Sequence, residues 1–182
     1  MLVITVNGEE LYDERIQEFV STEDVVLRLE HSLVSLSKWE SKFCKPFLGP
    51  EKKSREEVLE YIKAMVVGED IPDEVFSRLG HKNIEKINEY ISAENSATTF
   101  VETPQQKARG RSEIITAELI YFWMISYTVP MECENWHLNR LFALLKVCNI
   151  KNSKEKPMSA HEVAKRNRDI NAQRREKLGT SG

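Results

Sequence analysis

The sequence has few of the residues from which catalytic and metal-binding motifs are built. Its 182 residues include seven glycines, four histidines and three cysteines. No GxSxG motif, P-loop or GxGxxG motif occurs. The cysteines are odd in number, widely spaced and without a CxxC pair, which argues against a disulfide scaffold or structural zinc and suits a reducing compartment; they are Cys44, Cys133 and Cys148. We therefore expect a non-enzymatic protein without a metal or cofactor.

The sequence also lacks an export signal and a membrane-spanning run. Met1 leads directly into an apolar stretch, without a basic segment or a small-residue cleavage site. The longest apolar run, 114–129, has 16 residues and includes Glu118. A membrane span needs about 20 apolar residues. We expect a cytoplasmic protein in which this run is a buried core helix, and no membrane partner.

The net charge of −3 conceals an asymmetry between the body and the C-terminal tail. Residues 151–182 hold nine Lys or Arg and four Asp or Glu, which gives +5. The preceding 150 residues carry −8. A basic tail on an acidic body is typical of a tail that meets an acidic partner, either nucleic acid or protein. The alternative is a solvated helix without a partner.

The N-terminus has the alternation of β-strands. Apolar residues alternate from Leu2 to Val6, and Asn7-Gly8 predicts a hairpin turn directly after them. A second alternating segment contains Val25, Leu27 and Leu29. Two or three short strands need a packing partner, so we expect a small sheet that packs against helices.

From Ser32 onward the apolar spacing becomes helical. Ser54 and Glu57 form a capping box, and Ser159 and Glu162 form a second one. A polar loop is expected over 94–111. The expected helices cover 33 to before Pro46, Ser54 to Gly68, a short helix opened by Pro72, 81–92, Ser112 to Pro130, Met131 to Cys148, and Ser159 to Leu178.

These elements predict a mainly α fold with two parts. Residues 1–152 form a helical domain with a small N-terminal β-hairpin or sheet, and 153–182 form a protruding basic C-terminal helix and tail. The helices on either side of Pro130 are expected to form the core. The run Tyr121-Phe122-Trp123 is apolar all round, which favours a central helix over a cofactor site.

Glu134 and His137 form a Glu-x-x-His step, as in di-iron helix bundles. Such bundles need a second step and two more carboxylates, and no other histidine follows this pattern. The favoured alternative is structural, with His137, Asn139 and Arg140 lying beside an apolar stripe that begins at Leu138.

The C-terminal helix has too little apolar surface to dock firmly by itself. Val163 and Ile170 are seven residues apart, and Asn167 and Arg174 interrupt the stripe. Such a helix is either free or completed by a partner. Arginines at 166, 168, 174 and 175 are suited to phosphates, but the acidic body disfavours nucleic acid.

Four blocks of sequence resemble the tail assembly chaperones of long-tailed, siphovirus-type bacteriophages. They are SLSKWESKFCKPFLG, SEIITAELIYFWMISYTVP, WHLNRLFALLKVCNIKN and MSAHEVAKRNRDINAQRREKLGTSG. The resemblance implies a non-enzymatic, largely helical protein in the host cytoplasm. It would hold the aggregation-prone tape measure protein until tail tube proteins polymerise around it, and it would be absent from the mature virion. Self-association is left open.

A chaperone of this type needs surface that binds apolar helices reversibly. The candidate partner-binding residues are Trp39, Phe43, Phe47, Trp136, His137, Asn139, Arg140, Val163, Arg166, Ile170 and Arg174. For Trp39, Phe43, Phe47 and the segment from Trp136 to Arg140, core packing is the favoured role of each taken singly. Two other functions stay open: a nucleic-acid-binding phage regulator that uses the basic helix, and a structural virion component.

Overall fold

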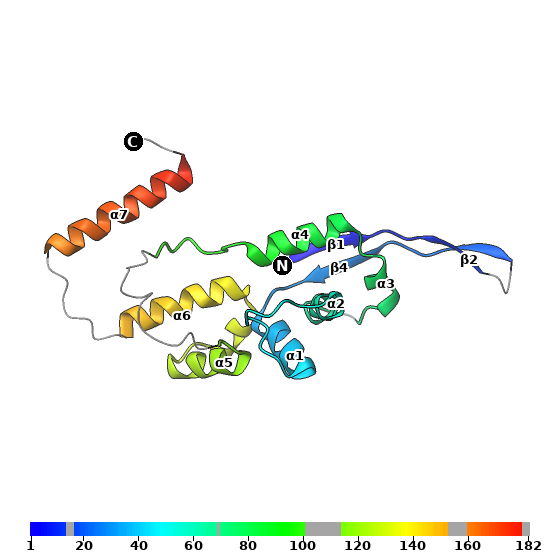
Figure 1. Cartoon of the computed structure of the whole chain (residues 1–182), viewed down its shortest axis with the longest axis horizontal. Helices are drawn as coiled ribbons and strands as arrows, with labels where there is room; N and C mark the ends of the chain where they lie inside the picture. The colour runs from blue at the N-terminus through cyan, green and yellow to red at the C-terminus, as the bar shows by residue number, and fades with distance from the viewer. Residues whose placement is uncertain (14–16, 69, 101–113, 153–159, 180–182) are drawn as a thin grey trace.

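The computed structural model describes residues 1–13, 17–68, 70–100, 114–152 and 160–179. Four short strands open the chain, and helices make up most of the remainder, so the predicted mainly α fold with a small N-terminal sheet is confirmed. Figure 1 shows the strands extending to one side of the helical body and the last helix standing at the other side. The strands are β1 Leu2–Val6, β2 Glu10–Asp13, β3 Glu18–Ser21 and β4 Val25–Leu29.

The strands form one long antiparallel ribbon. β1 pairs with β4, from Leu2 opposite Leu29 to Val6 opposite Val25, and β2 pairs with β3. The chain therefore runs outward through β1 and β2 and returns through β3 and β4 (Figure 1). The hairpin turn predicted at Asn7-Gly8 is wrong, because the chain passes straight through this dipeptide.

Gly8 is needed for the close approach of the two ribbon strands. Its amide donates to the Asp24 Oδ1 atom at 2.7 Å, and the Thr22 amide donates to the Glu9 carbonyl at 2.9 Å. A Cβ atom at Gly8 would lie only 1.7 Å from the Thr22 carbonyl oxygen. The role of glycine here is therefore to let the two strands approach closely, and it does not form a turn.

Replacing Gly8 by alanine is expected to lower the free energy of unfolding by about 1–3 kcal/mol, because two backbone strands must separate. Urea unfolding followed by circular dichroism measures this change. Gly80→Ala is the matched control, since nothing lies within 4 Å of a Cβ atom there. Equal stabilities of the two variants would contradict the assigned role of Gly8.

Two hydrophobic clusters share helix α1 (Leu33–Phe43). Trp39 belongs to the first cluster, with the inner face of the sheet and helices α2 (Arg55–Ala64), α3 (Asp73–Ser77) and α4 (His81–Ser92). Leu33 and Leu36 belong to the second cluster, with helices α5 (Ala117–Ser126) and α6 (Leu138–Asn152). The helices flanking Pro130 therefore form one of two cores, which corrects the prediction of a single core between them.

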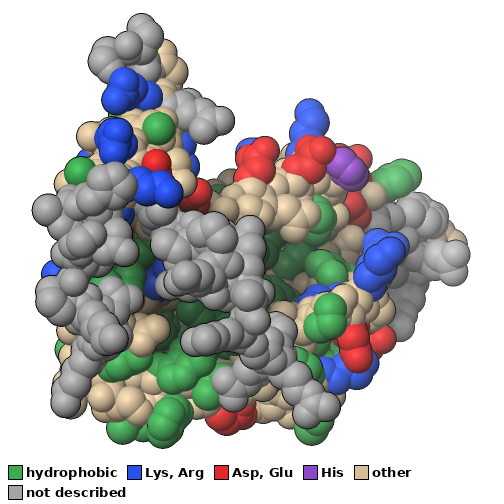
Figure 2. All heavy atoms as spheres, turned by 60° about the vertical axis from the view of Figure 1, so that its left-hand side comes forward, with side chains coloured by type: hydrophobic (Ala, Val, Ile, Leu, Met, Phe, Trp, Pro, Cys, Tyr) green, Lys and Arg blue, Asp and Glu red, His purple; other side chains and the backbone are tan. Residues whose placement is uncertain are grey.

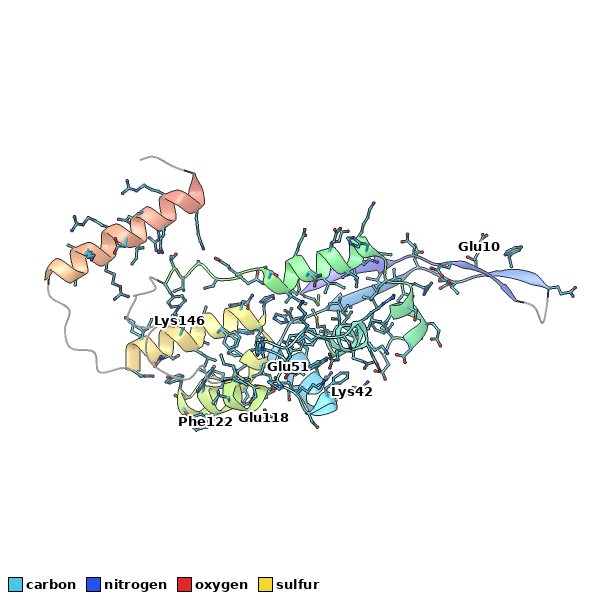
Figure 3. The ribbon with its side chains drawn as sticks, in the orientation of Figure 1. Glu10, Lys42, Glu51, Glu118, Phe122 and Lys146 are labelled. Atoms are coloured by element: carbon cyan, nitrogen blue, oxygen red, sulfur yellow. The ribbon has the colours of Figure 1, made fainter. Side chains whose placement is uncertain are left out.

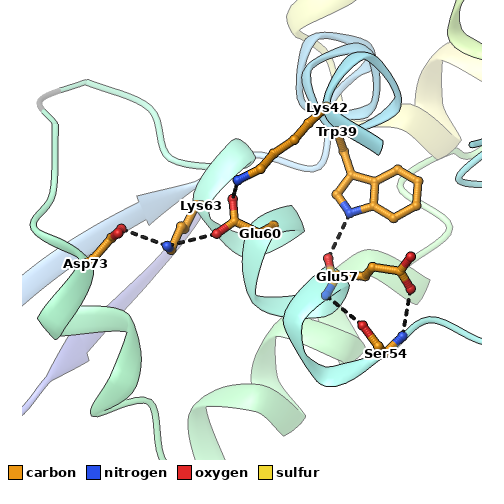
Figure 4. A network of polar contacts seen from close by, with 7 residues as sticks. All are labelled: Trp39, Lys42, Ser54, Glu57, Glu60, Lys63 and Asp73. Carbon is orange, nitrogen blue, oxygen red and sulfur yellow. Dashed lines mark hydrogen bonds and ion pairs between the residues drawn. The ribbon is translucent and has the colours of Figure 1, made fainter. Parts of the chain in front are cut away.

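Helix α2 begins at the predicted capping box. The Glu57 amide donates to Ser54 Oγ at 3.2 Å, and the Ser54 amide donates to the Glu57 carboxylate at 2.8 Å. Figure 4 shows this box beside the Trp39 indole, whose N–H donates to the Glu57 carbonyl at 2.8 Å. The capping box and the indole together fix α2 against α1.

Helix α2 stops at Ala64, earlier than the predicted stop at Gly68. The residues that follow pair with β4: the Glu30 amide donates to the Met65 carbonyl at 2.8 Å, and the Val67 amide donates to the Arg28 carbonyl at 2.9 Å. This pairing requires an extended chain, so the sheet ends the helix.

The chain around Pro130 also differs from the prediction. Helix α5 begins at Ala117 with Thr116 as its N-cap, and the expected start at Ser112 is wrong. The expected helix from Met131 to Cys148 is two elements, a 3₁₀ helix η2 (Met131–Asn135) and α6. They separate because His137 forms a β-bridge with Ser32, and the Leu138 amide donates to the His31 carbonyl at 2.7 Å.

Helix α7 (Ala160–Leu178) stands apart from the two clusters, as Figure 1 shows. Lys177 of this helix forms an ion pair with Glu94 of the body at 2.8 Å. Its predicted capping residue Ser159, the boundary region 153–159 and most of the expected 94–111 loop lie outside the described residues. Within the described ranges, no helix has the length and apolar character required to span a membrane.

Candidate partner-binding surface

The first group of predicted binding residues packs in or against the first hydrophobic cluster. Trp39 is 2% exposed. Phe43 and Phe47 are partly buried against the same cluster, with ring centroids 4.8 and 5.0 Å from the Trp39 ring. The Phe47 ring also stacks on Tyr61 at 3.9 Å. Trp39 is therefore a core residue, and its predicted place on a binding surface is corrected.

The second predicted group, Trp136 to Arg140, connects α6 to the end of α4. His137 is buried, and its Nε2 atom lies 3.0 Å from the Tyr90 carbonyl oxygen. The Asn139 amide group donates to the carbonyls of Ile91 and Ala93 at 3.1 and 2.8 Å. Arg140 lies 4.1 Å above the Trp136 ring. His137 and Asn139 are thus occupied by internal contacts, which corrects their placement on an open surface.

Glu134 and His137 do not share a helix face. Glu134 lies in η2 and accepts a hydrogen bond from the Tyr121 hydroxyl at 2.8 Å, whereas His137 is directed to α4. No cluster of three or more His, Cys, Asp or Glu side chains suited to a metal ion is found in the described part of the chain.

A buried polar cluster joins the two hydrophobic clusters. The His31 Nδ1 atom lies 2.6 Å from the Tyr61 hydroxyl, and the His31 and His137 rings are 5.1 Å apart. Burial lowers the pKa of His31 to about 4; nearby His137 adds to this shift, and Glu30 opposes it. His31 is therefore neutral at neutral pH. Its contacts are internal, so this cluster is structural.

The predicted residues on α7 are at the surface. Val163 is 42% exposed, Arg166 and Arg174 are exposed, and Ile170 is partly covered. Figure 2 shows the basic side chains on the upright part of the molecule, above the body. These residues lie on a different element from Trp136 and Arg140, so the structure does not gather the predicted set into one site.

An open groove of about 840 Å³ lies between α7, α6 and the extended segment before residue 101. Phe100, Phe142 and Ala143 provide apolar lining. Lys146 and Lys177 provide the positive charge, and the Lys146 ammonium lies 4.3 Å from the centre of the Phe100 ring. The groove has both apolar and cationic lining, which suits a polypeptide segment better than a small apolar molecule.

A second surface was missed by sequence analysis. One side of α5 buries Ala117, Ile120 and Met124. The opposite side, which we call the α5 face, consists of Glu118, Phe122, Ile125 and Ser126, all exposed. Phe122 is 61% and Ile125 is 67% exposed. Figure 3 shows Glu118 and Phe122 on the outer side of α5, away from the other helices.

The α5 face corrects the expectation that α5 is a central helix. A helix that is apolar all round is normally buried on all sides, but this one packs on a single side. Two more exposed apolar residues, Ile114 and Met131, flank the ends of α5 in the sequence. The sequence shows a long apolar run here, but such a run does not say which side of the helix lacks a neighbour.

Comparisons with protein-family models, with curated proteins and with solved structures found no match for this chain.

Proposed function

We propose that this protein is a phage tail assembly chaperone that binds the tape measure protein in the host cytoplasm and leaves before the virion is complete. The observation that carries the proposal is the α5 face. Its apolar residues Phe122 and Ile125 are exposed, whereas the opposite side of the same helix is buried. Such exposed apolar surface marks sites of protein interaction. The four sequence blocks that resemble this family include α5 itself.

The size of the α5 face suits a reversible holder. Full burial of an aromatic or branched side chain contributes about 1.5–3 kcal/mol. Phe122 is 61% and Ile125 67% exposed, so covering both contributes roughly 2–4 kcal/mol. Association costs about 4–15 kcal/mol in lost freedom of motion. One α5 face therefore binds weakly. A long partner with many apolar helical segments would be held by many copies of this protein, and each copy would dissociate easily.

The direct test is capture of the tape measure protein by the tagged full-length chain from nuclease-treated lysate of infected cells. We expect the wild-type chain to retain it and Phe122→Ala/Ile125→Ala to retain at least about tenfold less, because two apolar contacts are removed. Both side chains are exposed, so the variant should keep its thermal midpoint. Val26→Ala is the matched control, as an exposed apolar residue on β4.

Three results would contradict the proposal. The double variant could capture as much tape measure protein as wild type. Nuclease treatment could remove every captured partner, which would favour a nucleic-acid regulator acting through α7. Finally, the chain could be found in purified virions at the level of other tail proteins, which would make it a structural component.

A further inference from the structure

The α5 face lies within a segment that has only negative charge. Between Ile114 and Asn139 there is no Lys or Arg, and there are three carboxylates, Glu118, Glu132 and Glu134. Glu118 lies one helical turn from Phe122 and on the same side of α5 (Figure 3). The apolar surface and the negative charge therefore occupy the same side of this helix.

Glu134 is held near the middle of α5 by the chain fold. Its carboxylate accepts a hydrogen bond from the Tyr121 hydroxyl at 2.8 Å, which brings η2 alongside α5. Burial and this carboxylate raise the pKa of Tyr121 to about 12, so the phenol is neutral. Among the described residues, no Lys or Arg forms an ion pair with Glu118, Glu132 or Glu134. Within the described part of the chain, Glu118 and Glu134 therefore place negative charge beside α5 that no ion pair neutralises.

We propose that the α5 face selects amphipathic helices whose apolar stripe is bordered by Lys or Arg. The inference rests on the proposed function and adds to it the chemistry of the segments that are bound. Apolar residues of the partner would cover Phe122 and Ile125, and its cations would lie beside Glu118 and the η2 carboxylates. Charges at the rim of an apolar contact set partner choice and association rate more than affinity.

The α7 helix of a second copy is the competing occupant, because it is also basic. Its apolar content is small: Val163 and Ile170 lie seven residues apart, and Asn167 and Arg174 interrupt the stripe between and after them. A helix with little apolar surface gains little from covering Phe122 and Ile125. A longer apolar stripe on a separate partner fits the α5 face better.

The test uses two synthetic helical peptides of about 20 residues, long enough to be partly helical in water. They share one apolar stripe of Leu and Phe and differ only in their flanks, which are Lys in one and Glu in the other. Fluorescence anisotropy measures their binding to the full-length chain. We expect the Lys-flanked peptide to bind at least about tenfold more tightly, with a preference that shrinks as salt is raised.

Charge reversal supplies the decisive control. Glu118→Lys/Glu132→Lys is expected to reverse the preference, so that the Glu-flanked peptide binds more tightly. Glu56→Lys/Glu89→Lys makes the same change in net charge at exposed positions on α2 and α4 and should leave the preference unchanged. Phe122→Ala/Ile125→Ala should weaken both peptides.

Equal binding of the two peptides, or an unreversed preference in Glu118→Lys/Glu132→Lys, would overturn this inference. So would self-association of the chain that depends on Phe122 and Ile125, with neither peptide bound. The proposed function is tested separately by capture of the tape measure protein. Capture without a charge preference would reject the inference alone, whereas charge-selective peptide binding without capture would reject the chaperone function alone.

Discussion

Replacing Glu40 by alanine is expected to lower the free energy of unfolding by about 3–5 kcal/mol, the largest effect of any single substitution considered for this chain. The Glu40 side chain is buried, at 6% exposure. One carboxylate oxygen accepts a hydrogen bond from the Phe47 amide, and the other accepts one from the Ala117 amide, both at 2.7 Å.

The size of the effect follows from what the substitution leaves behind. Each hydrogen bond to a charged acceptor contributes about 1.5–3 kcal/mol, and a buried amide without a partner carries a cost of its own. Ala117 is the first residue of α5, where the helix dipole favours a negative charge. Glu40 thus links α1, the turn after it, and a helix 77 residues further along the chain.

Urea unfolding of Glu40→Ala and Glu40→Gln measures this contribution. Glutamine has one carbonyl oxygen, so it should keep one of the two hydrogen bonds and lose roughly half as much stability. Glu56→Ala, an exposed change on α2, should stay within about 0.5 kcal/mol of wild type. A loss below about 1 kcal/mol in Glu40→Ala would show that Glu40 does not join the two cores in solution.

The second large effect is a loss of stability in mild acid caused by His31. Its pKa is about 4 in the folded protein and 6.5 in the unfolded chain. Between these values the unfolded chain binds more protons, so the free energy of unfolding falls as the pH is lowered. One pKa unit corresponds to 1.36 kcal/mol, so His31 contributes a loss of about 2 kcal/mol by pH 5 and about 3 kcal/mol by pH 4.

The comparison of wild type with His31→Asn isolates this contribution from the carboxylates, which titrate in both proteins. Asparagine offers a polar group near the position of Nδ1, which lies 2.6 Å from the Tyr61 hydroxyl. Urea midpoints at pH 7, 6 and 5 should fall more steeply for wild type than for the variant. Parallel curves would mean that His31 is protonated in the folded protein at a pH near its ordinary pKa.

Sequence reasoning succeeded where the signal was local. The capping box at Ser54, the strand containing Leu27 and Leu29, and the short helix after Pro72 are all present. In each case the residues that determine the element lie within a few positions of one another. Such signals do not depend on contacts between segments that are distant in the sequence.

Sequence reasoning failed where a distant segment decides the conformation. Asn7-Gly8 has the signature of a turn, but the chain continues through it, because the Thr22 amide of the facing strand donates a hydrogen bond to the Glu9 carbonyl. The expected helix from Met131 is interrupted because His137 pairs with Ser32. The prediction of the binding residues was wrong for the same reason. The sequence shows that Trp39 and Phe122 are aromatic, but only the fold determines that Trp39 is buried and Phe122 is exposed.

Because α1 belongs to two cores, one of its sides is covered only late during synthesis on the ribosome. Leu33 and Leu36 share a cluster with residues of α5 and α6, and the last fully buried residue of that cluster is Leu145. At about 5–20 residues per second, the wait between Leu36 and Leu145 is roughly 5 to 20 seconds. During that time the nascent chain can complete the ribbon and α2, but one side of α1 stays uncovered. Throughout this interval the apolar side of α1 is open to contact with other polypeptide chains.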